Sequence, residues 1–374
     1  MTRPPIDGLR ICDAQLLLSP AALTAQLPLD EASADFVVRS RRAVEDIILG
    51  RDDRLLAVVG PCSIHDPAAA LDYANRLREA AARHASDLFV VMRAYLEKPR
   101  TIVGWKGLVN DPGLDGSFEV GRGLRLARQL LLDLAMLRVP AATEFLDPTL
   151  GRYYMELVTW GAIGARTVES QVHRALASGM SMPVGFKNRT DGDVQVAVDA
   201  LLSARHPHWF ASITEDGASA MLGTAGNDCA HVVLRGGKRG PNFGAADVRR
   251  ATELLRVAGL PQRLMVDCSH GNSGRDHTRQ PLVADDVAEQ IAAGQRAICG
   301  VMLESNLLDG AQTYRTHPFA YGRSITDPCL SWEKTLPVLA QLASAVHARR
   351  ARSKRPPQSS RDSFDSDRPA LIVT

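Results

Sequence analysis

Residues 55–84, LLAVVGPCSIHDPAAALDYANRLREAAARH, contain the pattern that decides the fold. The apolar residues at the start predict a buried strand, and Gly60-Pro61 ends it. From Asp66 onward the apolar residues recur with the spacing of an amphipathic helix, so the stretch predicts one strand followed by one helix. The turn between them places a cysteine, Cys62, at the carboxyl end of the strand.

The same strand-then-helix pattern recurs along the chain. Further apolar runs occupy residues 88–95, 141–147, 161–166, 182–187, 231–237, 263–270 and 297–305. Continuous apolar runs of this length are typical of parallel strands that are covered on both faces, and helical spacing separates most of them. Eight such units in about 250 residues predict an α/β fold of the (β/α)8 TIM-barrel type. A doubly wound sheet usually has fewer strands and a dinucleotide signature, and no GxGxxG motif follows a strand in this sequence.

Some segments lie outside the strand-then-helix units. Residues 1–54 predict a polar, helical N-terminal extension with an interface or regulatory role, and residues 55–349 predict the catalytic barrel. Within the barrel, residues 206–226 predict an extra β-hairpin that is punctuated by glycine. Residues 350–374 are rich in Arg, Ser, Pro and Asp and have almost no apolar periodicity, so we expect a disordered tail there.

The composition argues against several classes of partner. The 44 basic and 42 acidic side chains leave a net charge of +2, which gives no support for nucleic acid or a membrane surface as a partner. The six cysteines are spread singly with no CxxC pair, as expected for free thiols in a reducing compartment. No run approaches the roughly 20 apolar residues of a membrane span. We therefore expect a soluble, cytoplasmic protein.

The functional side chains of a TIM barrel lie at the carboxyl ends of its strands. Each predicted strand here ends in a possible ligand, a cation or an acid: Cys62, Arg93, Glu144, Arg166, Lys187, Arg235, His270 and Glu304. Singly, each has an ordinary structural explanation, because an isolated cysteine is often a small buried hydrophobe and a strand-end Arg or Lys is usually solvated. Their collection at one rim favours a binding site.

The polar residues of this rim divide into two chemical groups. The first consists of cations that would form a ring: Arg93, Lys98, Arg100, Arg166, Lys187 and Arg235. Such a ring needs anionic ligands, and phosphate or carboxylate groups accept the fork of Arg well. The second group, Cys62, His270 and Glu304, offers sulfur, nitrogen and oxygen ligands, which suit a first-row transition metal better than Mg²⁺ or Ca²⁺. The stretch AYGRSITDPC supplies Asp327 as a fourth ligand.

Long stretches of the sequence resemble one family. They are VRSRRAVEDI, VVGPCSIHD, MRAYLEKPRTIVGWKGLVNDP, WGAIGARTVESQVHR, PVGFKNRTDG, HVVLRGG, VDCSHGNS and GVMLESNL. On these motifs the chain, from Ile6 to about Val346, resembles class I 3-deoxy-D-arabino-heptulosonate 7-phosphate (DAHP) synthase, the first enzyme of the shikimate pathway. The resemblance implies a TIM barrel with an N-terminal extension and an extra hairpin, which condenses phosphoenolpyruvate with erythrose 4-phosphate.

The resemblance also implies roles for individual residues. The family's ligands for one divalent metal ion, such as Mn²⁺, Co²⁺ or Fe²⁺, are matched by Cys62, His270, Glu304 and Asp327. Its phosphoenolpyruvate pocket is matched by Arg93, Lys98, Arg166, Lys187 and Arg235, with the backbone at Gly164-Ala165. Glu144 and Asp327 complete the expected substrate-binding set. In the segment KPRT, Arg100 and Thr101 match residues that receive the erythrose phosphate, whereas related 3-deoxyoctulosonate 8-phosphate synthases resemble KANR there.

The implied mechanism is an aldol-like condensation. The methylene carbon of phosphoenolpyruvate attacks the aldehyde while water adds to the carbon that bears phosphate, and the metal acts as a Lewis acid. Lys98 would protonate the aldehyde oxygen if neighbouring Arg charges lower its pKa, so Lys98, Cys62 and His270 form the expected catalytic set. The alternatives are a related 3-deoxyoctulosonate 8-phosphate synthase, a Schiff-base aldolase with Lys187 as nucleophile, and a non-catalytic phosphosugar sensor.

Regulation and assembly are further expectations from the resemblance. Members are commonly inhibited by an aromatic amino acid that binds between the barrel, the hairpin and a neighbour's N-terminal extension, so we expect a homodimer or homotetramer. The segments concerned, unless they are ordinary interface loops, are residues 1–30, 147–153, 176–182 and 209–222. Gly151 favours tryptophan, because members inhibited by phenylalanine or tyrosine tend to carry Pro there, while Ser181 resembles the phenylalanine type. Gly151→Pro should then relieve inhibition without changing uninhibited turnover.

Overall fold

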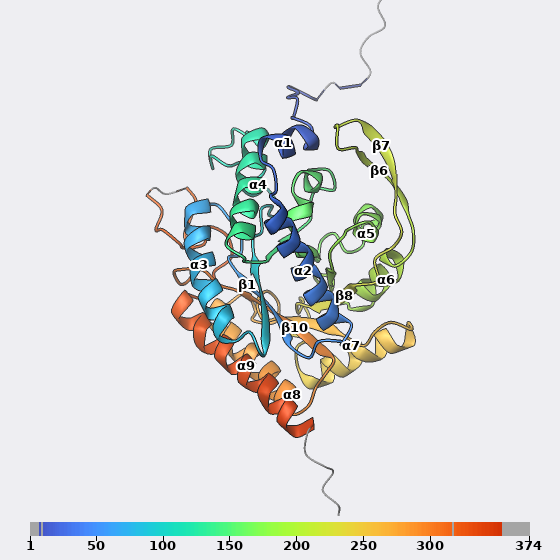
Figure 1. Ribbon diagram of the computed structural model, residues 1–374, viewed down its shortest axis with the longest axis vertical. Helices are drawn as coiled ribbons and strands as arrows, with labels where there is room; N and C mark the ends of the chain where they lie inside the picture. Colours follow the sequence, from blue (N-terminus) through green and yellow to red (C-terminus); the bar gives the residue numbers. More distant parts are fainter. Residues whose placement is uncertain (1–6, 9, 316–317, 354–374) are drawn as a thin grey trace, which may run out of the picture.

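The computed structural model describes residues 7–8, 10–315 and 318–353 and contains a closed barrel of parallel strands (Figure 1). Around the barrel the strands follow the order β1-β10-β9-β8-β5-β4-β3-β2. Their bounds are β1 Leu55–Gly60, β2 Leu88–Arg93, β3 Ala141–Glu144, β4 Trp160–Ile163, β5 Val184–Lys187, β8 Ala230–Leu234, β9 Leu264–Asp267 and β10 Ile298–Glu304. Each apolar run singled out in the sequence is one of these strands.

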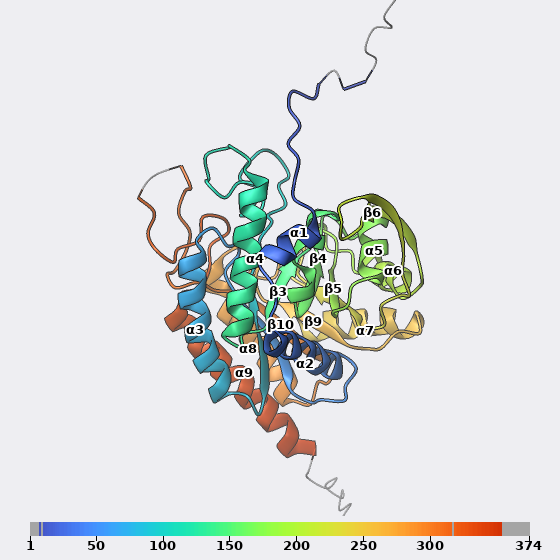
Figure 2. The ribbon, with the colours of Figure 1, turned by 45° about the horizontal axis from the view of Figure 1, so that its top comes forward.

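Helices surround the barrel and alternate with most of the strands (Figure 2). They are α3 Pro67–Arg83, α4 Val120–Met136, α5 Gln171–Ser178, α6 Gln195–Ala204, α7 Ala245–Val257, α8 Gln280–Ala292 and α9 Trp332–Ser353. Short 3₁₀ helices are η1 Leu150–Tyr153, η2 Met155–Leu157 and η3 His277–Arg279. The predicted (β/α)8 TIM barrel is therefore confirmed.

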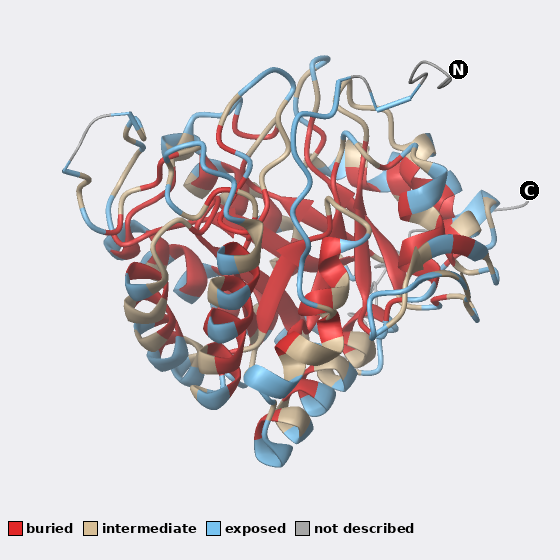
Figure 3. Cartoon of the chain, turned by 90° about the horizontal axis from the view of Figure 1, so that it is seen from above, coloured by how far each residue is buried: buried red, intermediate tan, exposed pale blue. Residues whose placement is uncertain are grey.

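The first strand-then-helix unit shows how the local sequence produces the fold. Every residue of β1 is buried, as expected for a strand covered on both faces. Figure 3 shows the central strands in the colour of buried residues. Asp66 then caps α3, because its side chain accepts hydrogen bonds from the backbone N–H groups of Ala68 and Ala69, and Pro67 occupies the first turn. The apolar face of α3, including Tyr73 and Leu77, packs into the core outside the barrel.

The inside of the barrel forms a second apolar cluster, which the N-terminal segment helps to fill. Inward-facing strand residues such as Leu56, Trp160 and Met265 pack together with Val44 and Ile47 of helix α2, Glu31–Ile48. This apolar cluster fills the inside of the barrel beneath the rim formed by the carboxyl ends of the strands. In a barrel of this kind the functional side chains lie at that rim.

The N-terminal segment and an extra hairpin lie against the β3–β4 side of the barrel. Between β3 and β4 the described chain forms only the 3₁₀ helices η1 and η2. Arg41 of α2 reaches this connection and donates to the backbone oxygens of Val158, Met155 and Glu156. The shorter helix α1, Pro20–Gln26, meets the hairpin through the Ala21 N–H, which donates to the Glu215 oxygen at 2.8 Å.

The hairpin and the chain end can be compared with the sequence predictions. Strands β6, Trp209–Ile213, and β7, Ser219–Gly223, pair antiparallel within the predicted insertion. Helix α9 continues through Ser353, so the expected disorder of residues 350–353 is wrong: Arg350 is held there by Asp53 and Asp87. The rest of the expected tail, residues 354–374, lies outside the described residues. Among the helices of the described residues, none is long and apolar enough to cross a membrane.

Candidate active site

The carboxyl ends of the strands surround a cavity of about 300 Å³. The side chains predicted from the sequence that line it are Arg93, Lys98, Arg100, Thr101, Glu144, Ala165, Arg166, Lys187, Arg235, His270 and Asp327. Cys62 and Glu304 are buried directly beside this lining, and both contact residues of the cavity. The structure therefore brings the cations and the possible metal ligands together in one place.

A thiol and two carboxylates form a compact cluster at one side of the cavity. Single ligand atoms of Cys62, Glu304 and Asp327 all lie within 4.8 Å of one another. The Lys98 ammonium contacts two of them, at 2.7 Å from the Cys62 Sγ and 2.9 Å from the Asp327 Oδ2. One sulfur and two oxygen donors at this spacing fit a first-row transition metal ion. The chemistry of the donor set thus agrees with the expected metal site.

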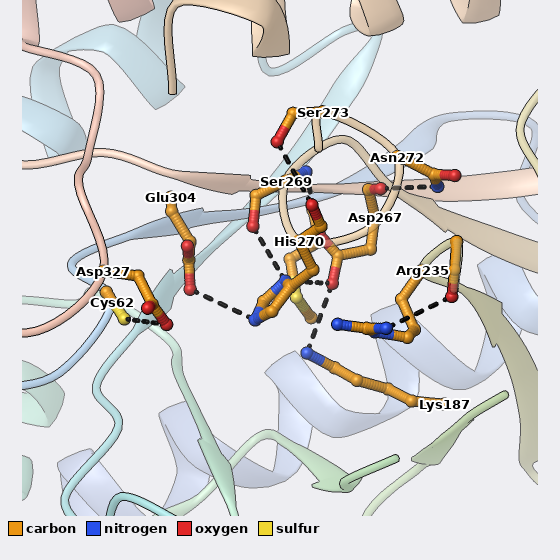
Figure 4. Close-up of polar contacts among 12 residues, drawn as sticks. Cys62, Lys187, Arg235, Asp267, Ser269, His270, Asn272, Ser273, Glu304 and Asp327 are labelled. Atoms are coloured by element: carbon orange, nitrogen blue, oxygen red, sulfur yellow. Dashed lines mark hydrogen bonds and ion pairs between the residues drawn. The ribbon is translucent and has the colours of Figure 1, made fainter. Parts of the chain in front are cut away.

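His270 stands beside this cluster (Figure 4). Its backbone has a φ of 51°, the left-handed region that non-glycine residues seldom adopt, and this turn aims the ring back into the barrel. The His270 Nε2 lies 3.5 Å from the Glu304 Oε1. The Nδ1 lies 2.9 Å from the Asp267 Oδ2 and 2.8 Å from the Ser269 Oγ. A histidine held through one nitrogen presents the other as a ligand.

The charges in this cluster shift the pKa values of its members. Burial, together with the Glu304 carboxylate, raises the pKa of the Cys62 thiol to about 12. Burial acts to lower the pKa of Lys98, but the neighbouring Cys62 and Asp327 outweigh it and raise that pKa above its ordinary value. The expectation that Arg charges lower the pKa of Lys98 is therefore wrong. The nearest groups to this ammonium are anions and a thiol, and they favour its charged form.

The cationic side of the cavity holds more positive charge than its carboxylates neutralise. Arg93 is fully buried between the Glu304 carboxylate, at 3.2 Å, and the ring of Tyr95, whose centroid lies 3.8 Å from the guanidinium carbon. Arg235 is 7% exposed, and burial together with nearby Arg275 and Arg166 lowers its pKa. Buried cations without a carboxylate partner require an anion from outside the chain.

Two of the predicted residues at the mouth contact each other. The Arg166 Nε donates to the Thr101 Oγ1 at 3.2 Å, and both side chains are exposed. Arg100 stands on the same segment and is fixed through its Nε, which donates to the Trp105 oxygen at 2.7 Å. Arg100 also lines the cavity. An anionic group at the mouth would therefore meet donors from two different strand ends.

The backbone at Gly164-Ala165 allows a close approach of another chain segment. A Cβ at Gly164 would overlap the carboxylate of Glu144, which is itself 6% exposed. Glycine is thus required at this position for Glu144 to lie against the loop after β4. Ala165, the next residue, lines the cavity.

Several residues of the site were not predicted from the sequence. Tyr95 and Thr190 line the cavity, as does Arg275. Asp267 is fully buried and lies 3.2 Å from the Lys187 Nζ as well as 2.9 Å from His270. The available signal for Asp267 was an acid at the end of a strand, in VDCSH, where His270 drew attention instead.

The segments expected to hold an effector border a second cavity, of about 330 Å³. It is lined by Thr24, Arg41, Arg152, Met155, Glu156, Ser181, Met182 and Glu215. Ser181 therefore lies where the sequence suggested. Gly151 faces a different neighbour, because a Cβ there would meet the Phe145 Cδ1 at 2.8 Å. The ring of a proline at position 151 would therefore clash with the Phe145 side chain before it narrowed this cavity.

Comparisons with known proteins agree with this geometry. A family model described as the DAHP synthetase I family matches residues 28–340. The Phe-sensitive phospho-2-dehydro-3-deoxyheptonate aldolase of Escherichia coli K12 is 53% identical over 92% of this chain and 98% of its own. The Trp-sensitive enzyme of Enterobacter agglomerans is also 53% identical, over 92% of this chain and 99% of its own.

A solved structure gives the same result for the fold. The structure of the phospho-2-dehydro-3-deoxyheptonate aldolase of Francisella tularensis SCHU S4 has a TM-score of 0.89 and 51% sequence identity with this protein. The match covers 91% of this chain and 99% of that one. With a family model that spans most of the chain and relatives of more than 50% identity over nearly their whole length, the chain belongs to the DAHP synthetase I family.

Proposed function

We propose that this protein condenses phosphoenolpyruvate with D-erythrose 4-phosphate and water to give DAHP and phosphate, the first step of the shikimate pathway. One observation carries the proposal: a single cavity has more cations than carboxylates in its lining, including the buried Arg235, on one side and a thiol-carboxylate cluster on the other. Both substrates are phosphorylated anions, and one of them is an aldehyde whose oxygen gains negative charge during the reaction. The family relationship agrees with this reaction.

The cations of the site would bind phosphoenolpyruvate. Arg235 and Arg166 both line the cavity, and burial, with smaller contributions from Arg275 and Arg166, lowers the pKa of Arg235, so a dianion bound between them would offset this unfavourable charge. Lys187 is buried, with its Nζ 3.2 Å from Asp267. Burial lowers the pKa of Lys187, but Tyr95 and Asp267 outweigh this and raise it, so the ammonium stays charged at neutral pH. A charged amine binds an anion and is not a nucleophile, which argues against the Schiff-base aldolase.

Lys98 would supply the proton to the aldehyde oxygen. Lys98 lines the cavity, and the Cys62 and Asp327 groups outweigh burial and raise its pKa, which favours the charged ammonium. A charged donor that is already in place stabilises the alkoxide that forms when the new carbon–carbon bond closes. Arg100 and Thr101 stand at the mouth on the same segment, where they would receive the phosphate of the aldehyde.

Cys62, Glu304, Asp327 and His270 would hold one divalent metal ion, and we propose Mn²⁺, Co²⁺ or Fe²⁺ because the donor set mixes sulfur, nitrogen and oxygen. When bound, such an ion supplies Lewis-acid polarisation. The chain itself orients the ligands: Asp267 and Ser269 hold the His270 ring, and Arg93 holds Glu304.

Regulation, assembly and location are parts of the same proposal. We propose that an aromatic amino acid inhibits the enzyme at the cavity that Ser181 lines, with tryptophan as the first candidate and phenylalanine as the alternative. Arg41, Arg152 and the nearby carboxylates Glu156 and Glu215 offer both charges that a free amino acid requires. We also propose a homodimer or homotetramer, and a reducing cytoplasm as the location, which the six free cysteines favour.

The deciding experiment follows product formation from phosphoenolpyruvate and erythrose 4-phosphate, with and without a chelator. We expect turnover that the chelator abolishes and added Mn²⁺ or Co²⁺ restores. Replacing erythrose 4-phosphate by arabinose 5-phosphate tests the 3-deoxyoctulosonate alternative, and borohydride trapping with substrate tests the Schiff base. Cys12→Ala, which removes an exposed thiol, is the matched control for changes at Cys62. Absence of turnover by metal-loaded enzyme would refute the proposed function.

A further inference from the structure

A buried carboxylate stands next to the proposed proton donor, and the mechanism does not use it. Glu97 follows β2 directly before Lys98 and is 1% exposed. Its Oε2 accepts hydrogen bonds from the backbone N–H groups of Leu146 and Asp147, at 3.4 Å each, and from the Tyr154 hydroxyl at 3.2 Å. Burying a carboxylate among neutral donors costs free energy that a neutral side chain of similar size avoids.

The segment that begins at Glu97 carries residues of the proposed aldehyde site. Lys98, Arg100 and Thr101 all line the main cavity. The segment turns back on itself, because the Lys98 N–H donates to the Lys106 oxygen at 2.8 Å. Gly107, with a φ of 113°, is packed so closely that a Cβ there would lie 2.6 Å from the Glu97 Cα. Glu97 is thus fixed at the start of a tight loop, and the residues that follow it line the cavity.

The donors to Glu97 belong to a different connection, the one between β3 and β4. Leu146 and Asp147 follow β3, and Tyr154 separates η1 from η2. This connection is itself well fixed: the Tyr154 and Phe145 rings stack with centroids 6.2 Å apart, and the Leu146 oxygen lies 2.7 Å from the His173 Nε2. The Glu97 carboxylate therefore joins the loop after β2 to the well-fixed connection between β3 and β4.

We propose that Glu97 is a positioning residue, whose carboxylate holds the loop of Lys98, Arg100 and Thr101 against the β3–β4 connection at the place where these side chains meet the aldehyde substrate. The inference rests on the proposed function for its kinetic part. Lys98 is the residue next to this anchor and its Nζ reaches the Cys62 Sγ and the Asp327 Oδ2, so a shift of the loop moves the proposed proton donor, and a displacement of about 1 Å at such a group can cost up to about 100-fold in rate. Lys187 ends β5 and Arg235 follows β8, so other strands hold these two residues, and Arg166, after β4, contacts the loop only through its hydrogen bond to Thr101.

The test compares Glu97→Leu, Glu97→Gln and Tyr154→Phe with the wild type. Glu97→Leu removes the acceptor, Glu97→Gln keeps one carbonyl oxygen for the same donors, and Tyr154→Phe removes one donor. For Glu97→Leu we expect the KM for erythrose 4-phosphate to rise about 10-fold or more and kcat to fall, while the KM for phosphoenolpyruvate changes less than threefold. Glu97→Gln should restore most of the loss, and Tyr154→Phe should show a smaller change of the same kind.

A second readout does not depend on activity. Trypsin cleaves after Arg100 and Lys106, and a loosened loop exposes these bonds, so Glu97→Leu should be cut there at least fivefold faster than wild type in the native state. Gln290→Leu is the control: Gln290 of α8 donates to the Phe243 oxygen at 2.9 Å on the outside of the barrel, and this variant should change neither the KM ratio nor the cleavage at Arg100.

The outcomes separate the two proposals. An active wild type whose Glu97→Leu variant keeps both KM values and its resistance to trypsin overturns the positioning role. Equal losses toward both substrates, without faster cleavage at Arg100, also overturn it, because they indicate general destabilisation. A wild type without turnover refutes the proposed function, and the trypsin comparison then still decides whether Glu97 holds the loop. If Glu97→Leu does not fold, Tyr154→Phe, which removes one of the three donors to Glu97, carries the test, and unchanged KM values and unchanged cleavage after Arg100 in that variant overturn the positioning role.

Discussion

Replacing Glu97 by Gln should make the protein more stable above neutral pH. Burial is the largest cause that raises the pKa of this carboxyl, from 4.5 to about 7, and the adjacent Asp147 adds to it. The backbone donors of Asp147 and Leu146 and the Tyr154 hydroxyl act in the opposite direction but do not cancel the effect of burial. The ionised carboxylate is therefore a net cost in the folded state, and the neutral amide removes that cost.

The sign and size of the effect follow from proton binding. Between pH 4.5 and about 7 the folded state keeps the Glu97 proton that the unfolded state has lost, so the free energy of unfolding falls as pH rises through this window. The difference between the two pKa values corresponds to about 3 kcal/mol above pH 7, as an upper bound. Below pH 4.5 both states are protonated and the term vanishes. Glu97→Gln should thus gain up to about 3 kcal/mol over wild type at pH 8 and almost nothing at pH 4.5.

Equilibrium urea unfolding of chelator-treated protein between pH 4.5 and 8.5 measures this difference. Glu289→Gln, at an exposed position on α8, controls for the loss of a surface charge. A Glu97→Gln variant that is less stable than wild type at pH 8 would refute the reasoning, as would a difference that does not grow between pH 5 and 8. A gain in stability accompanied by weaker positioning of Lys98 would agree with a residue kept for function at a cost in stability.

Other substitutions test the rest of the site. Cys62→Ala should abolish activity and lower the affinity for Mn²⁺ or Co²⁺ with the fold intact, and full activity after chelator treatment would exclude the metal role. Arg100→Ala should weaken binding of erythrose 4-phosphate by about 1.5–3 kcal/mol, measured through the KM for that substrate. A change in the KM for phosphoenolpyruvate alone would show that Arg100 has been assigned to the wrong substrate. Asp267→Asn should lose about 3–5 kcal/mol in urea unfolding because it leaves Lys187 unpaired, and a loss below 1 kcal/mol would contradict this. Gly151→Pro should relieve inhibition by an aromatic amino acid, and overpacking against Phe145 should lower the free energy of unfolding by about 1–3 kcal/mol, seen as a lower melting temperature; inhibition at wild-type strength would count against the effector proposal.

The barrel and its rim could be predicted because their signals are local. A run such as Leu55–Gly60 must be apolar throughout to be buried on both faces, and that requirement is visible in any single strand. Once the runs are identified, the fold places every strand end at one rim, so Cys62 and His270 become neighbours although they are distant in sequence. The barrel and its rim could thus be predicted from the apolar pattern of each segment and from the rule that all strand ends of such a barrel meet at one rim.

The contacts between individual side chains could not be predicted in the same way. The direction of the pKa shift of Lys98 depends on whether cations or anions lie nearest, and the structure places the Cys62 Sγ 2.7 Å away. A sequence gives the composition of the rim without these distances. Asp267 was missed for a related reason, since an acid at a strand end gives no sign that its side chain will contact both Lys187 and His270. Similarly, the end of α9 is fixed by the pairing of Arg350 with Asp53, which no local pattern reveals.

The same Asp267 joins the two chemical halves of the cavity. Figure 4 shows it between Lys187 and Arg235 on one side and His270, Glu304 and the Cys62 thiol on the other. Its carboxylate is fully buried and contacts Lys187 and His270 at once, so the charge it offers to one depends on the charge of the other. If an anionic substrate binds Lys187 as proposed, it competes with Asp267 for that ammonium, and more of the carboxylate's charge is then available to the His270 ring. We therefore expect Asp267→Asn to weaken phosphoenolpyruvate binding and metal binding together, measured as the KM for phosphoenolpyruvate and the affinity for Mn²⁺.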